Sequence, residues 1–277
     1  MKDKLFDYVS RKNLIYDLSG VTKLICFLLS TMAVMFSYDI RVIAVVMVFS
    51  FAMLFVSQIR FVQIKGMLVY VLIFLALNAL LTFLFDPQYG VELYGTRHEL
   101  VRLFGRYVIT EEQLLYQCTK TLKYVSVVPL GILFFLTTHP SELAASINRI
   151  GVPYKAAFTL SLTLRYFPDI IRTYQDISLA QQSRGLDLSK KEKVFARVKN
   201  IMNICIPLIF STLTRVDIIA NTMDLRGFGK KKRRTWYSFK PLTGKDYAAI
   251  AVCLLLLLGS IFVSVFINHS KYFNPFI

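Results

Sequence analysis

Two stretches of the sequence, Met67–Phe85 and Ala248–Ile267, are long and apolar enough to cross a lipid bilayer, and neither contains a charged residue. A hydrocarbon core of about 30 Å takes about 20 helical residues. A backbone in hydrocarbon has to satisfy its own hydrogen bonds, so these stretches are predicted to be helices. Three shorter candidates follow a Lys or Arg: Leu24–Tyr38, Val42–Val56 and Tyr124–Thr138. We therefore expect an all-α integral membrane protein with about five transmembrane helices.

Basic residues flank or separate these apolar segments. The chain carries a net charge of +16, and 55% of its 277 residues are hydrophobic. That share exceeds the roughly 45–50% of soluble domains. The strongest cluster, GKKKRR at Gly229–Arg234, lies shortly before the last apolar segment. Since basic residues near a span favour the cytoplasmic side and anionic headgroups, we expect contact with anionic lipid and not with nucleic acid.

The positive flanks also predict the organisation of the chain in a bacterial-type cell membrane. Residues 1–138 are expected to form four membrane helices with an outside loop at 86–113. Residues 139–247 are expected to be a cytoplasmic or interfacial region of amphipathic helices. Residues 248–277 complete the chain with the last transmembrane helix and a tail. This arrangement places the amino terminus inside and the carboxyl terminus outside.

The region 139–247 has apolar residues at helical spacing among charged ones. Pro168 is expected to open a helix, and the stretch Asn200–Leu213 is expected to be a short interfacial or re-entrant helix because positive charge lies on both sides of it. One apolar stripe has spacings of three and four and predicts an amphipathic helix that lies at a surface or against a partner. The stripe consists of Ile209, Leu213, Val216, Ala220 and Met223.

The same helix ending occurs twice in this region. AQQSRGL contains Arg184-Gly185, and TMDLRGF contains Arg226-Gly227, each pair followed by an apolar residue. A glycine after a helix is a common left-handed cap, and a cation in the last turn complements the helix dipole. Arginine also makes bidentate pairs with carboxylates, which suits insertion into an acidic groove of a partner. We call each helix end with its arginine a tip, Arg184-Gly185 and Arg226-Gly227. Two similar tips favour a partner that is itself a dimer.

The sequence offers no sign of catalysis or of a cofactor. It contains no GxxxxGK[ST] phosphate loop, no GxSxG elbow and no HExxH motif. The three histidines are scattered, and the four cysteines form no CxxC pair, so no metal site is expected. A self-contained secondary carrier or channel is the main alternative function, although apart from Asn78 the spans are nearly bare of polar residues. A membrane-embedded enzyme would need clustered carboxylates or histidines.

Several short motifs, in order, resemble the transmembrane T component of energy-coupling-factor (ECF) transporters, the family that includes the cobalt-uptake membrane subunit. Ile150–Pro153 is similar to the Leu-Gly-Val-Pro turn of the family, and Leu164–Pro168 is similar to its Leu-Arg-Phe-x-Pro element. Ala180–Gly185 and Met223–Gly227 stand where the family has two Ala-Arg-Gly signatures, with Ser183 and Leu225 in place of alanine. RRTWY and the later Asp246 resemble the tail of the family.

The resemblance implies a non-catalytic scaffold subunit of an ATP-driven importer. Arg184, Gly185, Arg226 and Gly227 would dock into two ATP-binding cassette ATPases, as a hetero- or homodimer. The stripe Ile209–Met223 would be a platform for a small membrane S component that captures a vitamin or a metal ion. ATP binding and hydrolysis in the partners would then move the coupling helices and the S component.

Overall fold

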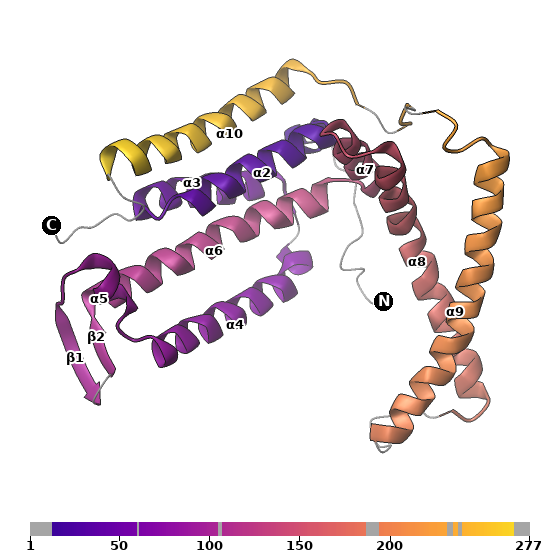
Figure 1. Cartoon of the computed structure of the whole chain (residues 1–277), viewed down its shortest axis with the longest axis horizontal. Coiled ribbons are helices and arrows are strands. Elements are labelled where there is room, and N and C mark those ends of the chain that lie inside the picture. Colours follow the sequence, from indigo (N-terminus) through magenta and orange to yellow (C-terminus); the bar gives the residue numbers. More distant parts are fainter. Residues whose placement is uncertain are drawn as a thin grey trace. The chain divides into compact units, whose positions relative to one another are not determined.

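The computed structural model describes residues 13–59, 61–104, 107–186, 194–231, 235–237 and 240–268. The chain divides into two compact units. Unit 1 comprises Met1–His139 and Lys240–Ile277, and unit 2 comprises Pro140–Phe239. Helices dominate both units, which confirms the prediction of an all-α membrane protein. Figure 1 shows the elements in chain order.

Unit 1 contains the five apolar segments predicted to be helices. They are α2 (Gly20–Phe36), α3 (Ile40–Val56), α4 (Phe61–Phe85), α6 (Glu111–Thr137) and α10 (Gly244–Phe262), which continues into a π-helical turn at Val263–Ile267. A short helix, α1 (Leu14–Asp17), precedes them. Of these helices, α4, α6 and α10 are long and apolar enough to cross a membrane, whereas α2 and α3 are shorter apolar helices.

Helix α6 packs against α2, α3 and α4, and α10 packs along α2 (Figure 1). Val34, Val46 and Leu130 form a buried apolar cluster where α2, α3 and α6 meet. A small polar side chain joins α10 to α2: the Ser260 hydroxyl of α10 donates to the Ala33 carbonyl of α2 at 2.8 Å. Small residues allow membrane helices to approach closely and bond across their interface.

A buried carboxylate, Asp246, caps two helices of unit 1 at once. One of its oxygens accepts from the Ser19 backbone N–H at 2.9 Å, at the start of α2. The other accepts from the Thr243 backbone N–H at 2.8 Å and from the Thr243 hydroxyl at 2.7 Å, at the start of α10. The first N–H groups of a helix lack intrahelical partners and favour negative charge. Asp246 therefore joins the beginnings of α2 and α10.

Two buried lysines of unit 1 donate to backbone carbonyls at the ends of neighbouring helices. Lys23 Nζ lies 2.9 Å from the Thr137 oxygen at the end of α6. Lys123 Nζ lies 2.8 Å from the Met35 oxygen near the end of α2 and 3.5 Å from the centre of the Tyr38 ring. The last carbonyls of a helix lack intrahelical donors and attract cations. Both lysines thus fix the end of one helix against the side of another.

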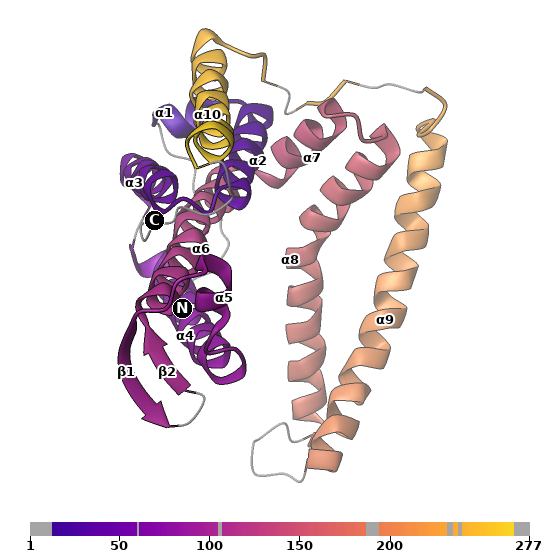
Figure 2. The ribbon, with the colours of Figure 1, turned by 60° about the vertical axis from the view of Figure 1, so that its left-hand side comes forward.

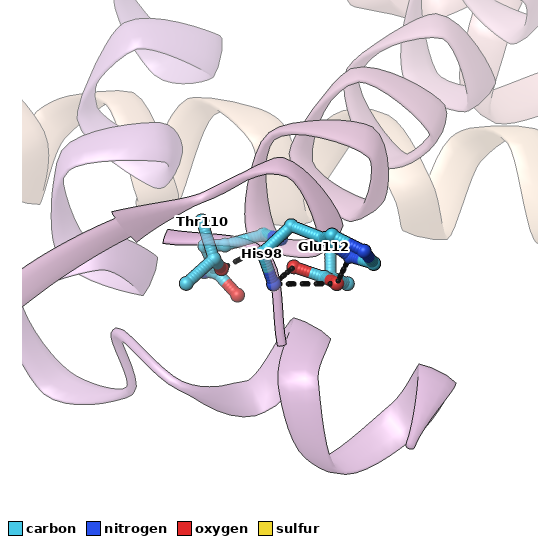
Figure 3. Close-up of polar contacts among 4 residues, drawn as sticks. His98, Thr110 and Glu112 are labelled. Atoms are coloured by element: carbon cyan, nitrogen blue, oxygen red, sulfur yellow. Dashed lines mark hydrogen bonds and ion pairs between the residues drawn. The ribbon is translucent and has the colours of Figure 1, made fainter. Parts of the chain in front are cut away.

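Residues 86–113, predicted only as a loop, form ordered structure. The segment contains α5 (Tyr89–Tyr94) and an antiparallel hairpin of β1 (Glu99–Phe104) and β2 (Tyr107–Thr110), which pairs Glu99 with Thr110. Figure 3 shows His98 beside the buried Glu112 at the start of α6. The His98 Nδ1 lies 2.7 Å from a Glu112 carboxylate oxygen, and the His98 backbone N–H donates to the same carboxylate at 3.0 Å.

Helix α5 lies directly against the first turn of α6, and Gly90 makes this approach possible. The Gly90 N–H donates to the Gln113 side-chain oxygen at 2.8 Å. A Cβ atom at Gly90 would lie only 2.6 Å from the Gln113 backbone nitrogen. Since backbone atoms cannot move aside as a flexible side chain can, this position accepts only glycine without a shift of α5.

Unit 2 contains α7 (Pro140–Arg149), α8 (Tyr154–Ser183) and α9 (Val194–Leu225). Helix α7 packs on α8, and α8 and α9 lie side by side in opposite directions (Figures 1 and 2). Two predictions were wrong here. Pro168 lies inside α8 and opens no helix, and the stretch Asn200–Leu213 is part of α9, which continues through Pro207. A proline removes one backbone donor but its φ fits a helix, so long flanking segments can continue through it.

By length and composition, residues Val198–Leu225 of α9 could also cross a membrane. The described part of the chain therefore contains four long apolar helices and two shorter ones, and α9 was not among the five predicted spans.

Candidate functional site

The two Arg-Gly pairs of unit 2 have the same backbone geometry. At the end of α8, the Gly185 N–H donates to the Gln182 carbonyl at 3.0 Å, and the Leu186 N–H donates to the Gln181 carbonyl at 3.1 Å. Gly185 has a φ of +88°. These two bonds, with a left-handed glycine, define a Schellman ending. The exposed Arg184 is the residue at which the helix stops.

The end of α9 repeats this pattern bond for bond. The Gly227 N–H donates to the Asp224 carbonyl at 2.9 Å, and the Phe228 N–H donates to the Met223 carbonyl at 3.0 Å. Gly227 has a φ of +69°. Arg226 is exposed beside this glycine, as Arg184 is beside Gly185. The repetition noticed in the sequence is thus a repetition of structure, with each arginine at a sharp turn of the backbone.

The two arginines lie at opposite ends of the α8–α9 pair. Arg184 follows the last residue of α8, whereas Arg226 follows α9 and lies near the first residues of α8. The contact between Phe228 and Tyr154, whose ring centres are 5.9 Å apart, places the second tip there. With a rise of about 1.5 Å per residue, the 30 residues of α8 span about 45 Å. This separation was not evident from the sequence.

Four aromatic rings gather at the Arg226 end of the pair, and we call them the aromatic cluster: Tyr154, Phe158, Phe228 and Trp236. Phe228 lies 4.7 Å from Phe158 between ring centres, and Trp236 lies 5.3 Å from Tyr154. The Trp236 indole N–H donates to the Asn148 side-chain oxygen at 3.1 Å. The sequence gives no local sign of this cluster, because its members are up to 82 residues apart in the chain.

The predicted stripe on α9 is exposed over most of its length. Ile209, Leu213 and Val216 are 56%, 54% and 52% exposed. Val216, Ala220 and Met223 line a groove of about 380 Å³ with α8 residues that include Leu162 and Tyr166. Ile209 and Leu213 do not line this groove. The structure thus divides the stripe into a part that faces α8 and a part that remains open.

Apolar exposure on α9 extends beyond the stripe. Phe210 and Ile218 are exposed, as is Leu225 at the end of the helix. A second groove of about 560 Å³ is lined by Tyr166, Arg215 and Ile218 among others. Helix α9 therefore offers apolar surface on more than one side. Such a helix needs lipid or another protein around it.

Among the residues that the structure describes, no group of three His, Cys, Asp or Glu side chains is placed to hold a metal ion. In the described part of unit 2, Arg172 and Asp169 form a long ion pair of 3.9 Å on the surface of α8.

The comparisons with known proteins agree with the motifs in the sequence. The family model described as CbiQ, cobalt transport protein, matches residues 11–237. The energy-coupling factor transporter transmembrane protein EcfT of Exiguobacterium sibiricum is 32% identical over 190 residues, which are 65% of this chain and 71% of that protein. The EcfT proteins of Bacillus subtilis and Streptococcus thermophilus are 26% and 24% identical, each over 90% of this chain and over 93% and 94% of their own lengths.

The match covers unit 1 as far as α6 and nearly all of unit 2, and it includes the α8 and α9 endings and the aromatic cluster. Together with the apolar helices, it identifies a multi-pass cell-membrane protein. The chain therefore belongs to the CbiQ/EcfT family of transmembrane transport proteins.

Proposed function

We propose that this chain is the transmission subunit of an energy-coupling factor importer, in which Arg184-Gly185 and Arg226-Gly227 each dock into one of two ATP-binding cassette ATPases. The observation that carries the proposal is the pair of identical Schellman endings with exposed arginines at opposite ends of α8–α9. A dimer presents the same groove twice, so a ligand with two matching tips suits it. In the carboxylate-lined groove of a partner, each arginine can form a bidentate pair.

The exposed face of α9 supports the second part of the proposal. The side chains of three apolar residues are each more than half exposed: Ile209, Leu213 and Val216. A small membrane S component, which binds a vitamin or a metal ion, would pack on this platform together with Ala220 and Met223. A change in the ATPase dimer on binding or hydrolysing ATP would move the two tips and with them the S component. Nucleotide chemistry then belongs to the partners.

For this mechanism the residues 139–247 have to face the cytoplasm, with their basic residues near anionic lipid. The single-cysteine variant Lys231→Cys, in a background without native cysteines, tests this placement. We expect an impermeant maleimide to label it in inverted vesicles and not in intact cells. Labelling in intact cells would contradict the topology.

The docking role is tested with the double variant Arg184→Ala/Arg226→Ala. Loss of one buried, bonded charge pair typically costs about 2–5 kcal/mol of binding, so we expect the ATPases to be lost from a mild-detergent purification. Arg172→Ala is the matched control, because Arg172 is an exposed arginine in the middle of α8 that forms a long pair of 3.9 Å with Asp169. Mass spectrometry of the wild-type sample should find two ATP-binding proteins and at least one small hydrophobic protein.

Normal recovery of both ATPases with the double variant would overturn the docking role. Recovery of the wild-type chain alone, or as a homo-oligomer, would favour a self-contained secondary carrier or channel instead.

A further inference from the structure

The Arg226 tip differs from the Arg184 tip in what holds it. Both tips have an apolar residue directly after the glycine, Phe228 in one case and Leu186 in the other. Phe228 enters the aromatic cluster, with its ring 4.7 Å from that of Phe158 and 5.9 Å from that of Tyr154. Leu186 is half-buried, and the described residues 178–186 contain no aromatic side chain. Phe228, two residues after Arg226, therefore packs the turn that carries Arg226 onto the start of α8.

Trp236 completes this attachment from further along the chain. Its ring lies 5.3 Å from Tyr154 and 6.4 Å from Phe158. Its N–H bonds to the side chain of Asn148, whose amide nitrogen donates in turn to the Val152 carbonyl at 2.8 Å. Asn148 thus links Trp236 to the turn between α7 and α8. The contacts connect three separate parts of the chain: the end of α7 with its turn, the start of α8, and the residues Phe228 and Trp236 that follow α9.

The surface around the attached tip is basic with an apolar part. Lys155 lies beside Gly229, with its Nζ 3.6 Å from where a Cβ atom would be. Lys230 and Lys231 follow on the exposed side of the turn. Ile150 and Val152 of the α7–α8 turn are exposed apolar residues. A surface of this kind fits an acidic partner that also has an apolar contact, and not a neutral one.

We propose that Phe228 and Trp236 are positioning residues that hold Arg226 in place before the ATPase binds, so that Arg226, Lys155, Lys230 and the α7–α8 turn meet the same ATPase subunit as one preformed surface. The inference rests on the proposed function, because it concerns how one of the two docking tips is presented. A preorganised binding element loses less conformational entropy on association, so it binds more tightly than the same residues on a loose turn. Around Arg184, the described residues 178–186 provide no aromatic side chain for a similar attachment.

The first measurement reads the attachment without any partner. A nitroxide spin label at Leu225→Cys, where the native side chain is 90% exposed, reports the mobility of the tip in the full chain reconstituted in nanodiscs, with the native cysteines replaced. We expect Trp236→Ala to increase this mobility and Trp236→Phe, which keeps a ring, to restore most of the wild-type spectrum. A label at Leu179→Cys, near the Arg184 end, should not respond to either change.

The second measurement is the affinity of the purified ATPase pair for the same nanodiscs. We expect Trp236→Ala to weaken it about tenfold and Trp236→Phe by less than about threefold, a range typical of lost preorganisation. Tyr237→Ala is the matched control, because this neighbouring aromatic residue is fully exposed and its loss should leave affinity unchanged. Thermal unfolding of each variant shows whether the fold is retained.

The outcomes separate the two proposals. If Trp236→Ala leaves the label mobility unchanged, or loosens the tip without weakening binding, the positioning role is wrong. If Arg226→Ala binds the ATPases as wild type does, the docking role of this tip is wrong, and the mobility data still decide whether the aromatic cluster holds it.

Discussion

Helices α6 and α9 are similar in length, with 27 and 32 residues, and both could cross a membrane by composition, yet their surroundings differ greatly. Helix α6 buries ten of its residues against other helices of unit 1. Among the described side chains of α9, Ile204 alone is fully buried. An apolar helix can thus serve either as the centre of a bundle or as a surface left for lipid and partners.

The polar residues show the same difference. In unit 1, Asp246, Lys23 and Lys123 are buried and bonded to the ends of helices. Along the α8–α9 pair of unit 2, Arg184, Asp217 and Arg226 are exposed, whereas Glu142 of α7 is buried. Substitutions should therefore affect folding in unit 1 and association in unit 2. Five variants test this contrast, from the largest expected effect on stability to the smallest.

The largest effect is expected for Asp246→Ala. It removes an acceptor from the buried Ser19 N–H and from the Thr243 N–H, and each unsatisfied buried donor costs about 1–3 kcal/mol. We expect a loss of about 3 kcal/mol in the free energy of unfolding, measured by denaturant or thermal unfolding in detergent. Asp217→Ala, on the exposed face of α9, is the control and should be nearly neutral. If the two variants lower the free energy of unfolding equally, the expected contrast between buried charges in unit 1 and exposed charges on α9 is wrong.

Gly90→Ala should be next. The new Cβ would lie 2.6 Å from the Gln113 backbone nitrogen, so α5 has to move away from α6. Overpacking of this kind typically costs about 1–3 kcal/mol. Hydrogen–deuterium exchange should show faster exchange in residues 89–113 with little change in unit 2. Gly131→Ala, in the middle of α6 with open space around it, is the control; if both variants unfold alike, the close approach of α5 does not matter.

Gly185→Ala and Gly227→Ala should each cost about 1 kcal/mol, because alanine is strained in a left-handed conformation. Their φ values are +88° and +69°, and Gly185 has no atom within 4 Å of a new Cβ. The cost is thus mainly one of backbone conformation. Asparagine at either position should be milder, since it tolerates this conformation better. If neither alanine variant changes the free energy of unfolding, the two endings are not held as Schellman turns.

The smallest effect on stability is expected for Leu213→Ser. Leu213 is 54% exposed, and surface substitutions usually change stability by less than about 0.5 kcal/mol. Co-purification of the S component should nevertheless fall, whereas that of the ATPases should not. Thr214→Ser, a neighbouring exposed position, is the control. A large loss of stability in Leu213→Ser would show that α9 supports the fold as α6 does.

The sequence was sufficient to predict the apolar helices of unit 1 and the two Arg-Gly endings, because both depend on local patterns. Local periodicity failed at Pro168 and Pro207, where long helices continue through a residue that often ends them. The hairpin at 99–110 was missed because its strands have only six and four residues and β1 includes the charged Glu99 and Arg102.

Contacts between distant residues could not be predicted from one sequence. Asp246 bonds to a residue 227 positions away, and Trp236 bonds to one 88 positions away. Nothing in the residues near Asp246 indicates that its second oxygen accepts from the start of α2. The division of the α9 stripe also depends on where α8 lies. Each of these features is set by the packing of whole helices.

If Arg184 and Arg226 each dock into one ATPase, as proposed, the α8–α9 pair would act as a rod held at its two ends. The tips lie about 45 Å apart, given the rise of about 1.5 Å per residue over the 30 residues of α8. A displacement of one tip by about 5 Å, close to one helical turn, tilts a rod of this length by about 6°. A point halfway along the rod then moves by only half as much, about 2.5 Å, while every side chain along it changes direction by the same angle. In the proposed complex, a movement of one ATPase by a few ångströms across the rod would therefore rotate the surface between the two arginines as well as shift it.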